Sequence, residues 1–385
     1  MQIDRARITA DLAEMIRIPS VNTFGDFSAK PSAEAVMADH YEHALRALGL
    51  EVDSHEVSQG RRNVWGVLKG AGTGPTTLMA GHLDTVGVEG YDDPFESKIE
   101  EDNIFGRGSC DMKAGLAAYL EVIRVLQSTD ETLSGDVIVA GVVDEEHAMV
   151  GSHAFGQRGP KVDFAIVAEP SQLKIAPAHK GQILMTLRTH GVAAHSSMPE
   201  KGVNAIYHMA RALQDLQGYA EDLRTRTPDA MCGLPSFSVG VIRGGDNACS
   251  VPDYCEIDLD RRTIPGEKHS DVLAEIRAVL DTVQAQTPDF KYDFETPFLD
   301  LPPLATDGAS PVMQAIETAC QDVIGRSEIM AFPGSTDAPN FNCPTVICGP
   351  GNLEQCHSLN EYVSLSEIED AVRIYVKTIQ NMQNI

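Results

Sequence analysis

Positively charged residues are scarce in this chain of 385 residues. It has 30 Lys and Arg residues against 56 Asp and Glu residues, so its formal net charge at pH 7 is −26. Such a charge repels the phosphates of nucleic acids and the headgroups of an anionic membrane, so we expect neither as a partner. The acidic residues are spread along the chain, which indicates a solvated surface rather than a functional tail.

Long apolar runs, targeting signals and paired cysteine motifs are also lacking. No apolar stretch approaches the ~20 residues that a membrane-spanning helix needs. The N-terminal sequence MQIDRARITADL is typical of a charged helix start and not of a signal peptide. The eight cysteines include no C-x-x-C pair, which favours buried free thiols in a reducing compartment. We therefore expect a cytoplasmic protein.

The length and the pattern of apolar residues predict two domains. Helices alternating with short apolar strands predict an α/β fold with a mostly parallel central sheet flanked by helices. This pattern covers residues 1–178 and resumes over 296–385, whereas 179–295 shows a β-α-β-β-α order typical of a smaller inserted α+β domain. In the first region we expect helices over 8–16 and 32–48, the latter capped by Ser32, and strands over 63–68, 78–82, 137–143 and 164–168.

Side chains with metal-binding chemistry follow the predicted strands. His82 ends one strand, Glu145 and Glu146 follow the next, Glu169 ends a third, and His357 follows a strand near the C-terminus. In a parallel sheet the site lies at the carboxyl ends of the strands, so we expect these residues to converge.

Two aspartates add to this set. Asp84 lies two residues after His82 on the same side of an extended segment, where its carboxylate can orient a metal-bound imidazole, although a single His-x-Asp is also common in solvated loops. Asp111 precedes a predicted helix, and an ordinary N-cap is the alternative explanation for it.

Together these residues offer two imidazoles and at least three carboxylates, which suits zinc, with cobalt or manganese as substitutes. One zinc needs only three protein ligands, so five candidates suggest two metal ions ~3.5–4 Å apart. The adjacent Glu145 and Glu146 cannot point the same way along a strand, so one can bind metal while the other takes a proton.

Eight motifs, in order and spacing, give the chain a resemblance to a known family. The motifs are GHLDTV (81–86), DPF (93–95), GRGSCDMKAG (106–115), DEEH (144–147), AEP (168–170), AAHSSMPEKGVNAI (193–206), DLDRRTIPGE (258–267) and CGPGNLEQCHSLNEYV (348–363). With these motifs the chain resembles the dizinc amidohydrolases and exopeptidases, which include acetylornithine deacetylase, succinyl-diaminopimelate desuccinylase and carboxypeptidase G-type enzymes, with acetylornithine deacetylase the favoured member.

The resemblance implies a zinc-exopeptidase-like catalytic domain and a role for each candidate. Asp111 would bridge two Zn²⁺ ions and precede a cis peptide bond. Glu145 would be the general base, and Asp84 would orient His82. His82 and Glu169 would complete one metal site, and Glu146 and His357 the other.

Further roles implied by the resemblance fall in and near the inserted segment, expected to be a lid and homodimerisation domain. His195 would stabilise the oxyanion, Arg262 would pair with a substrate carboxylate, and Gly334 and Ser335 would face the substrate. From the sequence alone, His195 is equally well an exposed residue in a helix-capping loop, and Arg262 a surface salt-bridge partner.

The chain departs from the family pattern at Cys249, where many members have Asn. Asn247 is the candidate substitute for that substrate contact, through a shifted loop.

The function expected from the resemblance is hydrolysis of the amide of an N-acyl amino acid similar to N-acetylornithine, in the context of arginine biosynthesis. A desuccinylase or a carboxypeptidase or dipeptidase with the same dizinc centre is the alternative within the class. A non-catalytic binding module on the same fold is the alternative outside it, but such a module would be expected to have lost some of the ligands, and none is missing.

Overall fold

The computed structural model describes residues 2–25, 33–129 and 132–383, and the chain divides into two compact units. The first unit consists of Met1–Ala178, Leu304–Phe332 and Thr336–Ile385, and the second of His179–Pro303 and Pro333–Ser335. The predicted helix cap Ser32 lies outside the described residues.

The division between the units differs from the predicted one at its second boundary. The second unit continues past residue 295 because the short strand β15 (Leu299–Leu301) pairs with β9 (Gly181–His190) of that unit. Prolines flank this strand at 297, 302 and 303, so the sequence pattern there indicates a loop rather than a strand. The first boundary falls between Ala178 and His179.

A nine-stranded sheet forms the centre of the first unit, and its main strand order is β1-β2-β6-β3-β7-β18-β8-β16. The four strands β6, β3, β7 and β18 run parallel, whereas β2 and β8 join them in antiparallel pairs. The strands of this unit are β1 (Glu51–Ser58), β2 (Arg61–Leu68), β3 (Thr77–His82), β4 (Lys98–Glu100), β5 (Asn103–Phe105), β6 (Val137–Val142), β7 (Phe164–Pro170), β8 (Ile175–His179), β16 (Leu304–Ala305), β17 (Ile329–Phe332), β18 (Thr345–Gly349) and β19 (Tyr362–Ser364).

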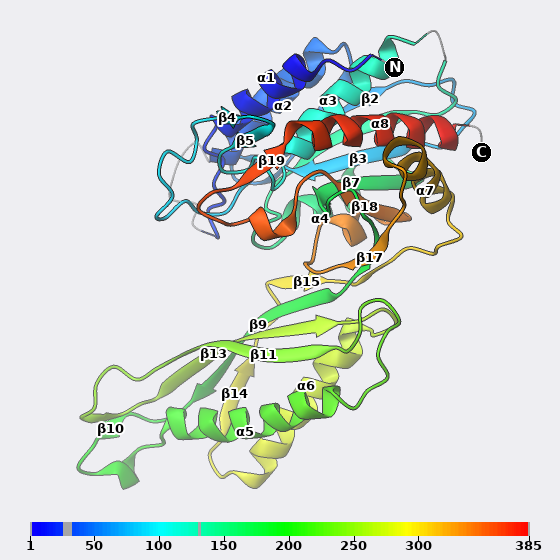
Figure 1. The fold of residues 1–385 in the computed structure, drawn as a ribbon. Coiled ribbons are helices and arrows are strands. Elements are labelled where there is room, and N and C mark those ends of the chain that lie inside the picture. The colour runs from blue at the N-terminus through cyan, green and yellow to red at the C-terminus, as the bar shows by residue number, and fades with distance from the viewer. Residues whose placement is uncertain (1, 26–32, 130–131, 384–385) are drawn as a thin grey trace. The chain divides into compact units, whose positions relative to one another are not determined.

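Helices cover both faces of this sheet (Figure 1), so its central strands β3 and β6 are buried along their whole length. Within β3, Met79 packs into the larger core under most of the helices, while Leu78 and Ala80 face a smaller core around Trp65 and Phe155. This layered sheet confirms the predicted α/β class. The helices of the unit are α1 (Arg5–Ile16), α2 (Ala33–Ala47), α3 (Lys113–Gln127), α4 (Val150–Arg158), α7 (Pro311–Ile324) and α8 (Leu365–Met382).

The second unit is an antiparallel sheet with two helices packed on one face. Its strand order is β11-β13-β9-β14, with β15 also paired to β9, and alternate residues of β9 and β13 are buried beneath the helices. Its elements are β9 (Gly181–His190), β10 (Ala194–His195), α5 (Ala205–Leu223), β11 (Ser236–Gly244), β12 (Ser250–Val251), β13 (Tyr254–Thr263), α6 (His269–Gln286), β14 (Lys291–Phe294) and β15 (Leu299–Leu301).

Among the helices of the described residues, none combines the length and the apolar character that crossing a membrane requires.

Candidate metal centre and active site

Four neighbouring parallel strands end at the candidate site. His82 ends β3, Glu145 and Glu146 follow β6, Glu169 lies near the end of β7, and His357 lies in the loop after β18. Because β6, β3, β7 and β18 are adjacent and parallel, their carboxyl ends meet at one edge of the sheet.

The carboxylate of Asp111 lies between the two imidazoles. Its Oδ1 is 3.0 Å from Nε2 of His82, and its Oδ2 is 3.4 Å from Nε2 of His357. Oε2 of Glu146 lies 3.2 Å from Nε2 of His357, and Oε1 of Glu169 lies 3.9 Å from Nε2 of His82. Each oxygen of Asp111 therefore faces one histidine, and each histidine has a glutamate beside it.

Asp111 reaches this position from the loop that precedes α3. The peptide bond between Asp111 and Met112 is cis, as the resemblance predicts. Although an N-cap role was the alternative for Asp111, the N-cap residue of α3 is Met112, which makes no side-chain capping bond.

Buried oxygen atoms in the cluster lack a hydrogen-bond donor within the described residues. Oε1 of Glu146 and Oε1 of Glu169 are both inaccessible to solvent and accept no hydrogen bond there. Buried carboxylate oxygens are normally paired or bound to a cation. One ligand atom each from His82, Asp111 and Glu146 lies within 4.8 Å of the others. With their imidazole and carboxylate donors, these residues fit a site for divalent cations such as zinc.

The pKa values of two groups in this cluster, Glu145 and His357, are raised, and negatively charged neighbouring carboxylates contribute to both shifts. Hydrogen bonds to Asp111 and Glu146 raise the pKa of His357 to about 10. Burial, reinforced by the nearby Glu169, raises the pKa of Glu145 well above that of a solvated carboxyl group. A divalent cation would neutralise the same charge, and a glutamate with a raised pKa is suited to accept a proton and return it.

Asp84 contacts the site through both its main chain and its side chain. Nδ1 of His82 donates to the main-chain oxygen of Asp84 at 3.0 Å, whereas the nearer carboxylate oxygen is 3.7 Å away. In the neutral imidazole this bond places the proton on Nδ1 and leaves Nε2 able to bind a metal. The carboxylate of Asp84 accepts the amide N–H groups of Glu145 and Glu146, at 3.2 and 3.1 Å. Asp84 thus holds both His82 and the segment with the two glutamates.

A group of buried polar residues lies behind Asp84 and could not be predicted from the sequence. Arg61 is buried and pairs with Glu34 and, at 2.6 Å, with Asp144. Nδ2 of Asn22 donates to the carboxylates of Asp84 and Asp144. These residues come from distant segments and resemble ordinary surface residues in sequence. The one available signal is the position of Asp144 directly before the two glutamates.

His195 lies in the second unit, in β10, and is exposed. Its Nδ1 accepts the amide N–H of Ser197 at 3.2 Å and lies 2.8 Å from the hydroxyl of the same residue. In the neutral ring the proton is therefore on Nε2, the arrangement that donation to an oxyanion requires.

The other predicted substrate-binding residues also belong to the second unit. Arg262 pairs with Asp260 at 3.0 Å and donates from Nη1 to the hydroxyl of Ser335, which follows Gly334. Oδ1 of Asn247 accepts the amide N–H of Cys249 at 2.9 Å. Asn247 therefore makes a hydrogen bond within the loop that contains Cys249.

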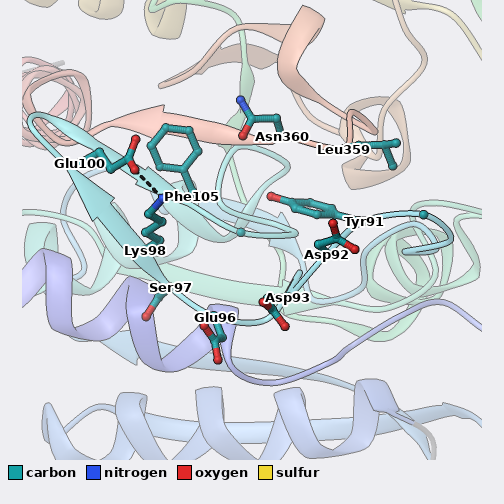
Figure 2. A pocket seen from close by; sticks show the side chains of 12 residues that line it. Tyr91, Asp92, Asp93, Glu96, Ser97, Lys98, Glu100, Phe105, Leu359 and Asn360 are labelled. Carbon is teal, nitrogen blue, oxygen red and sulfur yellow. Dashed lines mark ion pairs between the residues drawn. The ribbon is translucent and has the colours of Figure 1, made fainter.

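A separate cavity of about 820 Å³ lies in the first unit. Figure 2 shows the rings of Tyr91 and Phe105 in its wall among several carboxylates, and none of the candidate metal ligands lines it. The cavity is therefore distinct from the metal centre. Its lining residues are Gly90, Tyr91, Asp92, Asp93, Glu96, Ser97, Lys98, Glu100, Phe105, Gly106, Leu359 and Asn360.

A family profile matches most of the chain. The profile of Peptidase family M20/M25/M40 matches residues 78–381, a range that includes every candidate ligand. An acetylornithine deacetylase from Proteus mirabilis is 30% identical over 378 residues, covering 96% of this chain and 95% of the relative. One from Edwardsiella ictaluri is 32% identical, covering 83% of this chain and 84% of the relative.

Solved structures with the same fold include two peptidases. A tripeptidase from Staphylococcus aureus superposes with a TM-score of 0.78 at 20% identity, covering 100% of both chains. An M20 family metallo-carboxypeptidase from Sulfolobus solfataricus has the same TM-score of 0.78 at 17% identity, covering 98% of this chain and 99% of the other. At these identities the likeness establishes the shared fold.

Proposed function

Because the chain belongs to Peptidase family M20/M25/M40 and is a hydrolase, we propose that it cleaves the amide bond of an N-acyl amino acid similar to N-acetylornithine. The products would be a carboxylate and the free amino acid. The name shared by the relatives at 30% and 32% identity supports this substrate class.

The observation that carries the proposal is the position of Asp111 between two histidines, each with its own glutamate. His82, Asp111 and Glu169 would hold one Zn²⁺, and His357, Asp111 and Glu146 the other, with Co²⁺ or Mn²⁺ as possible substitutes. When bound, such a pair of metal ions polarises the acyl oxygen of the substrate. It also lowers the pKa of a water molecule, which then ionises near neutral pH.

The protein's own groups would carry the remaining steps. Glu145 takes the proton of the attacking water and returns it to the leaving amine, which its raised pKa favours. Asp84 keeps Glu145 in place through the amide hydrogen bond described above. His195 would donate from Nε2 to the oxyanion, and the guanidinium of Arg262 would pair with the substrate carboxylate, with Ser335 beside it.

A small panel of substrates tests this function. Protein loaded with zinc or cobalt is assayed for amine release from N-acetylornithine, N-acetylmethionine, N-succinyl-diaminopimelate and several dipeptides. We expect clear preference for one acetylated amino acid. Preference for the succinyl substrate or for dipeptides would instead assign a desuccinylase or an exopeptidase.

Glu145→Gln separates catalysis from metal binding. Because the amide side chain cannot accept the proton of water, we expect kcat to fall at least ~10²-fold. Zinc content should remain that of the wild type, since Glu145 is not a proposed ligand. Glu96→Gln is the matched control: Glu96 is exposed and lines the separate cavity, so both quantities should stay unchanged. A Glu145→Gln protein with the wild-type rate would refute this mechanism.

We also propose that the enzyme acts in the cytoplasm, in arginine biosynthesis, as a homodimer formed through the second unit. All eight cysteines are free thiols, which supports a reducing compartment. Half of them are buried, fewer than we expect from the sequence; these are Cys110, Cys255, Cys320 and Cys348.

A further inference from the structure

Glu361 is a fully buried carboxylate to which the proposed reaction gives no role. Its exposed fraction is 0%, and it lies in the motif that carries His357. Its Oε2 accepts a hydrogen bond from Nη1 of Arg107 at 2.6 Å, and Arg107 is itself 2% exposed. An ion pair buried this deeply requires close geometry and further hydrogen bonds to offset its desolvation.

Those further hydrogen bonds come from the loop that carries Asp111. Oε2 of Glu361 accepts the amide N–H of Gly108 at 3.1 Å. Its Oε1 accepts the amide N–H groups of Cys110 at 2.8 Å and of Asp111 at 3.0 Å. Three main-chain N–H groups of one turn thus converge on a single carboxylate, as in the anion-binding nests of other loops. The main chain of Asp111 is therefore held directly by Glu361.

The main chain around Glu361 joins the same two segments. Strand β19 pairs with β5, with Tyr362 opposite Phe105. One residue beyond that pair, the amide N–H of Gly106 donates to the main-chain oxygen of Glu361 at 3.1 Å. From this junction, one segment runs forward to Asp111 and the other runs back to His357.

We propose that Glu361 is a positioning residue of the metal centre. It holds Asp111 through the amide group of that residue, and it anchors the C-terminal end of the short segment that begins at His357. The separation between these two ligands is thereby set by the protein before a cation binds. This inference rests on the proposed function, because it assigns Glu361 to the same metal site.

Glu361→Gln tests the proposal at nearly constant volume. The glutamine amide group has one acceptor oxygen and one donor nitrogen, so it cannot accept from both Arg107 and the amides of Cys110 and Asp111. We expect the affinity for Zn²⁺, measured by competition with a chelator, to fall at least ~10-fold, the lower range for residues that support metal ligands. We also expect kcat to fall, with a smaller change in KM.

Glu121→Gln is the matched control. Glu121 lies in α3 of the same unit, is 0% exposed, and accepts from Nη2 of Arg7 at 2.7 Å and from the amide of Asp4 at 2.9 Å. None of these contacts involves a candidate ligand. This variant should lose thermal stability while keeping the zinc affinity of the wild type. Wild-type zinc affinity in Glu361→Gln, whatever its melting temperature, would overturn the proposal.

Hydrogen exchange adds a readout that needs neither metal nor activity. In metal-free protein, the amides of Cys110 and Asp111 should exchange at least ~10-fold faster in Glu361→Gln than in the wild type, and remain unchanged in Glu121→Gln. Unchanged exchange rates in Glu361→Gln would contradict the positioning role of Glu361 but not the proposed function. If the wild-type protein binds no divalent cation, the proposed function itself is contradicted. If Glu361→Gln does not fold, Glu361→Asp retains the charge. It is shorter by one methylene, and the same measurements apply.

Discussion

At the scale of single residues, burial makes His179 sensitive to acid. The side chain is 0% exposed, its Nδ1 lies 2.8 Å from the main-chain oxygen of Lys180, and burial lowers its pKa to about 4. In an unfolded chain the pKa is about 6.5. Between these values the unfolded state binds more protons, so stability is complete above pH 6.5 and is lost as the pH falls towards 4.

His179→Gln should remove this dependence. From pH 7 to pH 5 the wild type should lose about 2 kcal/mol more stability than the variant, because a pKa difference of one unit corresponds to about 1.4 kcal/mol. Urea unfolding of both proteins at the two pH values gives the comparison. Other groups titrate in both proteins, so only the difference reports on His179. Equal losses in the two proteins would assign the acid sensitivity to other groups.

The convergence of the candidate ligands could be predicted from the sequence, but the contacts that support them could not. His82, Glu146 and Glu169 stand at strand ends, so a local pattern reveals them. The contact of Asp84 with the amides of Glu145 and Glu146 joins segments about sixty residues apart, and no local pattern records it. The sequence also gives no indication that the main chain of Asp84, rather than its carboxylate, accepts from Nδ1 of His82.

At the scale of elements, close approach of two strands positions Glu169. Gly349 of β18 lies against the end of β7, and a Cβ atom there would be 2.1 Å from the main-chain oxygen of Ala168 and 2.5 Å from that of Glu169. Main-chain atoms in a central sheet cannot move as freely as a side chain. A larger residue at Gly349 must therefore separate the strands beside the proposed ligand.

Gly349→Ala should therefore destabilise the protein by about 2 kcal/mol, within the range for overpacked sites. It should also weaken zinc binding, since Glu169 moves with β7. Gly218→Ala in α5 is the control, because its Cβ would have nothing within 4 Å, and we expect it to stabilise by about 0.5–1 kcal/mol. Melting temperatures and zinc titrations of the two variants provide the measurements. Wild-type stability in Gly349→Ala would show that the strands separate at little cost.

The elements that could be predicted from sequence are the ones with strong apolar patterns. The central strands β3, β6 and β7 are buried on both faces and stand out as apolar runs. Strand β1, EVDSHEVS, was not predicted because it is an edge strand with a mostly half-exposed surface and charged residues. Its extended shape depends on pairing with β2, which is a tertiary effect.

At the scale of the whole molecule, the order of elements can be predicted from the sequence. The unit to which each short segment belongs cannot. The inserted antiparallel region is recognisable from its two amphipathic helices and alternating strands. Residues 333–335, however, belong to the second unit although they lie about thirty residues beyond its main segment. Ser335 joins that unit by hydrogen bonds with Arg262 and with the main chain of Lys180, and such contacts leave no periodic signal.

All proposed metal ligands lie in the first unit, so metal binding should stabilise that unit in particular. A cation at ~100 times its Kd stabilises by about 2.7 kcal/mol, which corresponds to about 5 °C in Tm for a unit of this size. The chain's one tryptophan, Trp65 in β2, reports on the same unit. We expect zinc to raise the Tm followed by Trp65 fluorescence by about 5 °C, and EDTA to reverse this.

Glu145→Gln should keep the shift and Asp111→Asn should lose most of it. If zinc does not change the Tm, the buried carboxylates of this cluster do not form a metal site.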